Sequence, residues 1–151
     1  MFSIGDLSRK TGVKVPTIRY YEQMGLISAP SRSEGNQRRY SQTELKCLSF
    51  IKHARDLGLS IQAIRELMDL SAHPERPCTH ADKIALAHLS DVRARISQLK
   101  RLEAELERIV EGCQGDHVSD CYVIHSLADH SLCTTEHEAN QSFKAVSNTE
   151  K

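Results

Sequence analysis

The sequence predicts a mainly α-helical protein, in which a small basic domain precedes one long helix and a cysteine-containing loop. Apolar residues recur at spacings of three and four through most of the chain, as on the buried face of a helix. Aromatic residues make up only 5% of the 151 residues and there is no Trp, which argues against a large β-sandwich. Residues that start helices alternate with glycine and proline breakers.

The first two helices are predicted to be short and joined by a glycine turn. Ser3 can cap a helix over residues 4–10, and Gly12 allows a tight turn into a second helix that begins near Val15. Two short helices joined in this way are typical of a helix-turn-helix. Residues 28–40 are rich in Pro, Ser, Gly and Asn and carry three arginines, which indicates a hairpin or wing.

Two further helices complete the predicted winged helix-turn-helix domain. Ser41 and Glu44 have the capping-box spacing, in which each side chain satisfies a backbone N–H near the other residue. Ser60 can start the next helix, whose apolar residues recur at i, i+3 and i+4. Pro74 and Pro77 then end the unit.

The long helix is predicted from about residue 80 to residue 111, where no Gly or Pro interrupts the chain. At ~1.5 Å per residue it would be roughly 45 Å long. A single apolar stripe cannot be buried on so small a domain, so we expect this helix to pair with a second copy in a homodimer. The stripe, in which Leu102 departs from the strict heptad register, consists of Leu89, Val92, Ile96, Leu99, Leu106 and Val110.

A loop between Cys113 and Cys121 follows the long helix. The apolar segment 122–127 could form one or two helical turns, and the chain beyond Cys133 is polar, so we expect a disordered tail. The predicted organisation is a DNA-binding domain at 1–70, a connector at 71–79, the dimerisation helix at 80–111, the loop with a short helix at 112–133, and the tail at 134–151.

The charge is distributed unevenly although 20 basic and 20 acidic residues cancel. Residues 1–70 carry a net charge of +4 and residues 71–151 a net charge of −4, so the first half is suited to a polyanion. No apolar run could span a bilayer, and charged residues interrupt any signal peptide, so we expect a cytoplasmic protein that does not contact membranes. An odd number of cysteines, five, favours metal or thiol chemistry over a disulfide framework.

Basic and tyrosine side chains concentrate on the second helix and the wing. The arginines can neutralise phosphates and the tyrosines can offer hydroxyls to phosphate oxygens, while base contacts must come from the start of the second helix and from the wing. The alternative is that the tyrosines form the core, where at least one of the adjacent pair must lie, and that the arginines are solvated. The predicted DNA-binding residues are Lys14, Thr17, Arg19, Tyr20, Tyr21, Arg32, Arg38, Arg39 and Tyr40.

The run IGDLSRKTGVKVPTIRYYEQMGLI at 4–27, with GNQRRY at 35–40, closely resembles the winged helix-turn-helix of MerR-type transcription regulators. The TIRYYE and RRY elements together are highly specific, and the resemblance covers residues 2 to about 125. It implies homodimers with an antiparallel coiled coil that bind a near-palindromic promoter whose spacer is too long for RNA polymerase. An effector then twists or kinks the DNA so that the polymerase reads both promoter elements.

Cys113 and Cys121 are candidate metal ligands, because the nine-residue loop lets both sulfurs meet at one ion. Thiolates prefer soft or borderline metals such as Cu(I), Zn, Cd, Pb and Hg. The alternative is a reduced, inert pair. His117 could be a fourth ligand or bind a second ion, although a solvent-exposed loop histidine is the more common case. We interpret Cys47 as a core residue and the group of His130, Cys133 and His137 as incidental.

Cys78 is a third candidate ligand that the length of the long helix keeps from its own loop. In an antiparallel helix pair, Cys78 of one subunit would meet Cys113 and Cys121 of the other. Three thiolates with a divalent ion leave a net charge of −1, which is easier to desolvate than the −2 left with a monovalent ion. The sequence therefore favours Zn, Cd, Pb or Hg, and it resembles the divalent-metal sensors of the family. The loop CQGDHVSDC instead resembles the copper-responsive type, which leaves Cu(I) possible.

No catalytic motif is present: the sequence has no glycine-rich phosphate loop, no HExxH, and no serine or cysteine beside an evident histidine base. We therefore predict a metal-responsive transcription regulator and not an enzyme. The alternatives are a thiol-redox regulator that uses the same cysteines, and a metal-trafficking protein or small thiol enzyme. The basic wing argues against an enzyme, and a three-cysteine site argues against simple redox pairing.

Overall fold

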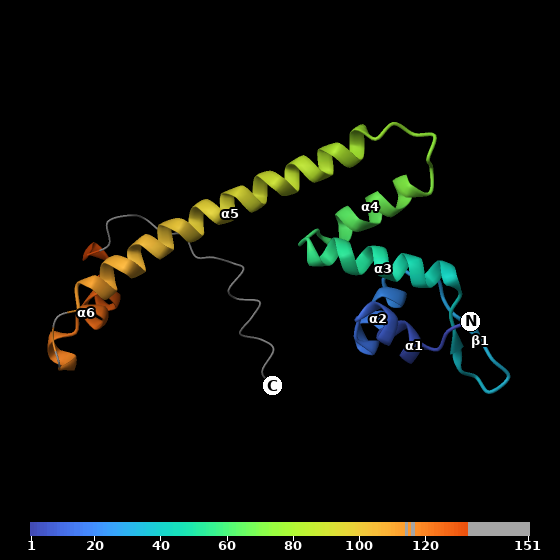
Figure 1. Ribbon diagram of the computed structural model, residues 1–151, viewed down its shortest axis with the longest axis horizontal. Helices are drawn as coiled ribbons and strands as arrows, with labels where there is room; N and C mark the ends of the chain where they lie inside the picture. The colour runs from blue at the N-terminus through green and yellow to red at the C-terminus, as the bar shows by residue number, and fades with distance from the viewer. Residues whose placement is uncertain (114, 116, 133–151) are drawn as a thin grey trace. The chain divides into compact units, whose positions relative to one another are not determined.

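The computed structural model describes residues 1–113, 115 and 117–132, and confirms the mainly α-helical class (Figure 1). Helices account for most of the described residues, and a two-stranded sheet forms the wing. The chain divides into two compact units, Met1–Leu86 and the residues from Ala87 onward, so the predicted connector 71–79 belongs to the first unit. No helix among the described residues is both long and apolar enough to cross a membrane.

Local capping interactions fix the first two helices. Helix α1 (Ile4–Thr11) begins with a capping box between Ser3 and Asp6 and ends at Gly12, whose φ of 73° lies in the left-handed region that favours glycine. Helix α2 (Val15–Gln23) carries its proline in the first turn, where the missing N–H has no helical acceptor to lose. The predicted helix-turn-helix is therefore confirmed.

The wing is a short antiparallel hairpin. Strand β1 (Ser31–Arg32) pairs with β2 (Arg38–Arg39), with Ser31 opposite Arg39. An isolated bridge between Phe2 and Tyr40 joins the base of the wing to the N-terminal end of the chain.

Helices α3 (Gln42–Asp56) and α4 (Ile61–Ser71) complete the first unit. The Ser41–Glu44 capping box starts α3, and the Ser60 side chain accepts the N–H of Ala63 at the start of α4, both as predicted. The apolar core of this unit consists of Leu7, Val13, Ile18, Tyr21, Leu26, Ile27, Tyr40, Leu48, Ile51, Ala54 and Ile64.

Helix α5 (Thr79–Glu111) is one unbroken helix of 33 residues, close to the predicted bounds (Figure 1). It is followed by a 3-10 turn η1 (Val118–Asp120), helix α6 (Tyr122–Ala128) and a second turn η2 (His130–Leu132). Helix α6 confirms the predicted short helix. Three side chains, Glu105, Ile109 and Ser126, form the buried part of this second unit. The predictions for Cys133, His137 and the tail 134–151 lie outside the described residues.

Candidate DNA-binding face and candidate cysteine site

Helix α2 presents part of the predicted DNA-binding set at its surface. Lys14 stands at its N-terminal end and is exposed, as is Arg19, while Thr17 is half-buried. The adjacent tyrosines face opposite ways, because Tyr20 is 48% exposed and Tyr21 only 7%. The expectation that one of them faces inward is therefore confirmed, and Tyr20 is the one available to DNA.

Tyr40 departs from its predicted role. Its side chain is fully buried, and its hydroxyl donates a hydrogen bond to the Glu22 carboxylate. Burial and the Glu22 carboxylate together raise the pKa of Tyr40 well above its ordinary value, so the hydroxyl keeps its proton. A buried hydroxyl that donates to a carboxylate is not offered to a phosphate. Tyr40 therefore fastens the base of the wing to α2.

The wing carries three arginines, one on β1 and two on β2. Arg38 Nε lies 3.5 Å from a Glu22 carboxylate oxygen, and the side chains are 38% and 11% exposed. Arg32 donates a 2.6 Å hydrogen bond to Asn36 across the turn, where Asn36 has a positive φ of 60°. Arg39 is half-buried on β2. Glu22 thus holds Arg38 in a defined place while leaving part of its guanidinium accessible.

Replacing Arg38 by alanine is expected to weaken binding to specific and to random DNA alike. A phosphate contact carries no sequence information, so its loss should also reduce the slope of log K against log salt by about one unit. Titrations of a labelled duplex at several salt concentrations measure both quantities. Lys52→Ala, which removes an equal charge from the Lys52–Asp56 pair on α3, is the matched control and should leave the slope unchanged. An unaltered slope for Arg38→Ala would show that Arg38 is only surface charge.

The two loop cysteines lie together in the second unit. Cys113 follows the end of α5 and Cys121 is the N-cap of α6, and the Cys113 thiol lies close enough to that of Cys121 to lower its pKa. The backbone N–H groups of Ile124 and Val123 and the Cys113 thiol lower the pKa of Cys121, against a smaller opposing effect of burial. The thiolate, which is the form that binds metal, is therefore favoured at Cys121.

Gly115, in the loop that joins these cysteines, lies very close to Asp120. A Cβ atom at Gly115 would lie 2.7 Å from Asp120 Cβ and 3.1 Å from the Asp120 carbonyl oxygen, so only glycine fits there.

Sequence reasoning missed a second set of residues near the cysteines, Glu105, Arg108 and Tyr122, which are joined by hydrogen bonds. Glu105 and Arg108 have the i,i+3 spacing of one helix face, but no pattern in the sequence indicates that Tyr122, fourteen residues after Arg108, joins them.

The other two candidate ligands, Cys78 and His117, are both exposed. Cys78 is exposed just before α5, in the first unit, and its thiol lies 3.9 Å from an Asp82 carboxylate oxygen. His117 is exposed. No group of three or more His, Cys, Asp or Glu residues in the described part of the chain is placed to hold a metal ion. Cys47 is half-buried in α3, and burial raises the pKa of its thiol.

Two family models match this chain. The model described as MerR HTH family regulatory protein matches residues 2–71, and the model described as MerR, DNA binding matches residues 45–109. The heavy metal-dependent transcription regulator 2 of Rhizobium meliloti is 35% identical over 85% of this chain and 88% of its own length. ZntR of Escherichia coli K12 is 37% identical over 81% of this chain and 87% of its own length. CueR of Salmonella typhimurium is 33% identical over 83% of this chain and 91% of its own length.

Two solved structures of transcription regulators are also similar to this chain. PbrR691 from Ralstonia metallidurans CH34, in complex with lead(II), is 35% identical with a TM-score of 0.73, covering 84% of this chain and 99% of that one. MerR from Bacillus megaterium MB1, in complex with mercury(II), is 29% identical with a TM-score of 0.62, covering 85% and 100%. With its winged helix-turn-helix, its long helix and these relatives, the chain belongs to the MerR family of DNA-binding transcription regulators, which are not enzymes.

Proposed function

We propose that this protein is a metal-responsive regulator that binds promoter DNA as a homodimer and activates metal-resistance or efflux genes when a thiophilic ion binds. The observation that carries the proposal is that Cys113, just after α5, and Cys121, at the start of α6, lie at the two ends of one short loop, with the thiolate of Cys121 favoured by the N-terminal end of α6. Two thiols at the ends of one short loop suit a soft metal ion, which would be held by both sulfurs. The relatives named for heavy metals, and those solved with lead(II) and mercury(II), support the same conclusion.

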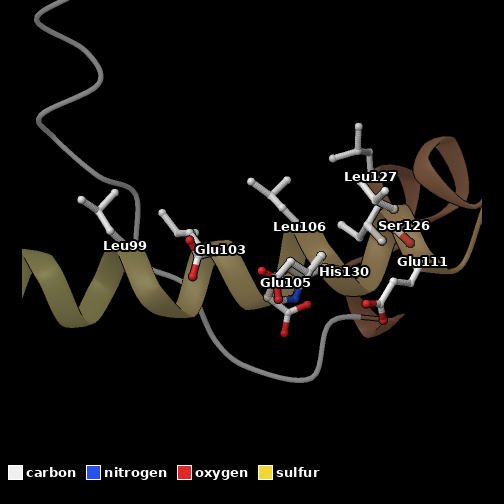
Figure 2. Close-up of a pocket in the computed structure, with 12 residues that line it drawn as sticks. Leu99, Glu103, Glu105, Leu106, Glu111, Ser126, Leu127 and His130 are labelled. Carbon is white, nitrogen blue, oxygen red and sulfur yellow. The ribbon is translucent and has the colours of Figure 1, made fainter.

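The exposed apolar surface of the second unit supports the homodimer. Leu99, Leu106 and Leu127 point to the same side of α5 and α6 and line an open groove of about 930 Å³ (Figure 2). In the single chain these leucines are 47%, 60% and 75% exposed. A contiguous apolar surface of this kind marks an interaction site, and a second copy of α5 carries the stripe that would cover it.

We favour a divalent ion, Zn, Cd, Pb or Hg, as the effector. A three-thiolate site for a divalent ion needs one thiolate more than the two that the described part of one loop supplies. Cys78 of a second subunit is our candidate for the third thiolate. Cys78 lies at the exposed start of α5, which an antiparallel dimer would bring to the partner's loop. Cu(I) or Ag(I), which two thiolates satisfy in a linear arrangement, is the alternative effector.

A metal titration combined with transcription in vitro tests the proposal. DNA sites selected by the protein from a random pool would be placed before a reporter with an over-long promoter spacer, with RNA polymerase added. In reducing buffer we expect Zn, Cd, Pb or Hg to bind with defined stoichiometry per dimer and to raise transcription, and Cys121→Ser to abolish both effects. Cys47→Ala removes a thiol outside the loop and is the matched control. A response to oxidants and not to any metal would instead establish the thiol-redox regulator.

A further inference from the structure

We propose that Tyr122 is a positioning residue for the cysteine pair. Its ring packs on Gly112 and its hydroxyl is held by Arg108, which together fix the separation of the Cys113 and Cys121 sulfurs. The inference deepens the proposed function, since that separation would determine how readily one ion meets both thiolates.

The contact between Tyr122 and Gly112 lies immediately beside both thiols. Gly112 directly precedes Cys113, and Tyr122 directly follows Cys121. A Cβ atom at Gly112 would lie 2.3 Å from Tyr122 Cδ1 and 2.6 Å from Cε1, so the ring rests on the Gly112 backbone. The φ of Gly112 is outside the left-handed region, so its backbone does not require glycine. The position therefore requires glycine because of the tyrosine ring.

A buried carboxylate anchors the ring through an arginine. Arg108 Nη1 donates a 2.6 Å hydrogen bond to the Tyr122 hydroxyl, and the guanidinium carbon lies 5.8 Å from the ring centroid. The same guanidinium donates to a Glu105 oxygen from Nε at 3.1 Å and from Nη2 at 2.9 Å. Glu105 is only 5% exposed. The ring is thus tied to α5 at its hydroxyl and packed at its edge against Gly112, the residue that follows α5.

This arrangement makes the two ends of the loop one rigid unit. Without it, the loop would have to be ordered when the thiols converge on an ion, and ordering a flexible segment reduces affinity. With it, the two ends of the loop are already held together by the contacts of Tyr122. The predicted consequence is a high effective concentration of one thiol with respect to the other.

The thiol–disulfide equilibrium measures this effective concentration without any metal. Two reduced cysteines and one oxidised glutathione give the Cys113–Cys121 disulfide and two reduced glutathiones, so electrons and protons balance. The full-length protein would be equilibrated in glutathione buffers of known ratio, quenched with acid, and mapped by mass spectrometry for the 113–121 disulfide. Cadmium affinity of the same variants provides a second readout.

We expect Tyr122→Phe, which loses only the hydrogen bond, to lower the effective concentration about three- to tenfold. Tyr122→Ala and Gly112→Ala should each lower it more than about tenfold, because the first removes the ring and the second displaces it. Cadmium affinity should fall in the same order. An effective concentration that is unchanged in Tyr122→Ala would overturn the proposal.

A double-mutant cycle separates positioning from general damage to the loop. If the ring is the reason for glycine, adding Gly112→Ala to Tyr122→Ala should change the equilibrium little. Gly115→Ala, whose Cβ would meet Asp120 and not Tyr122, should have the same effect in both backgrounds. Equal effects of Gly112→Ala with and without the ring would refute the proposal.

Two further comparisons keep the result interpretable. Should circular dichroism show that Tyr122→Ala loses helix, Tyr122→Phe and Arg108→Gln remain to decide the proposal, and unchanged equilibria in both would overturn it. A wild-type protein that binds no metal, yet shows the predicted disulfide equilibria, would refute the proposed function and leave the role of Tyr122 in place.

Discussion

Replacing Leu99 and Leu106 together by aspartate is expected to convert the protein into a monomer. Both leucines lie on the exposed apolar side of α5, where they line the groove that we assign to the dimer. Fully burying an exposed leucine contributes roughly 1.5–3 kcal/mol, and only 47% and 60% of these two residues remain to be covered, so the four leucines of a dimer contribute about 3–6 kcal/mol. The aspartates would also place carboxylates in an apolar contact without partners. The loss corresponds to at least about a hundredfold rise in the dimer Kd.

Sedimentation velocity over a range of protein concentrations measures this change. Ala94→Asp with Ala104→Asp is the matched control, because it adds the same two charges at exposed positions of α5 that are outside the predicted stripe. The control should remain a dimer, and the leucine variant should sediment as a monomer that retains its helical circular dichroism. An unchanged dimer would remove α5 from the proposed interface.

The parts of the fold that sequence reasoning predicted are those fixed by residues a few positions apart. The Ser41–Glu44 capping box and the turn at Gly12 each depend on interactions within four residues, and both are found as predicted. Cys113 and Cys121 are predicted to meet because one short loop joins them, and their meeting at a metal ion stays a prediction. Neither inference needed knowledge of the tertiary structure.

The features that sequence reasoning missed depend on contacts between elements. Tyr40 was expected at a phosphate, yet its hydroxyl donates to Glu22, which is 18 residues away on another element. Glu105 is one of the charged residues on α5, and only the packing of α6 shows that it is buried. The spacing of residues along α5 reveals its apolar stripe. It does not reveal that α6 packs against the neighbouring face of α5, where Glu105 lies.

Cys78 tests the proposed site most directly, because it is the one ligand that a second subunit would have to supply. Changing Cys78 to serine should leave DNA binding by the metal-free protein nearly intact, since this side chain is exposed and outside the core. We expect most of the response to Cd, Zn or Pb to disappear. Losing a direct ligand should weaken divalent affinity by more than the roughly 10- to 100-fold that loss of a supporting residue costs.

The response to Cu(I) should instead be retained or improved in Cys78→Ser, because a linear two-thiolate site needs only Cys113 and Cys121. Transcription in vitro with each metal separates the two effectors, and Cys47→Ala, which removes a thiol from α3, controls for the loss of any one cysteine. The metal gates transcription only if its binding energy differs between two shapes of the dimer. A ligand shared between subunits would supply that difference, because the bond between the metal and Cys78 of the second subunit would form in one shape of the dimer and not in the other. A full divalent response from Cys78→Ser would show that Cys78 is not a ligand, and that the copper-like loop alone determines which metal the protein senses.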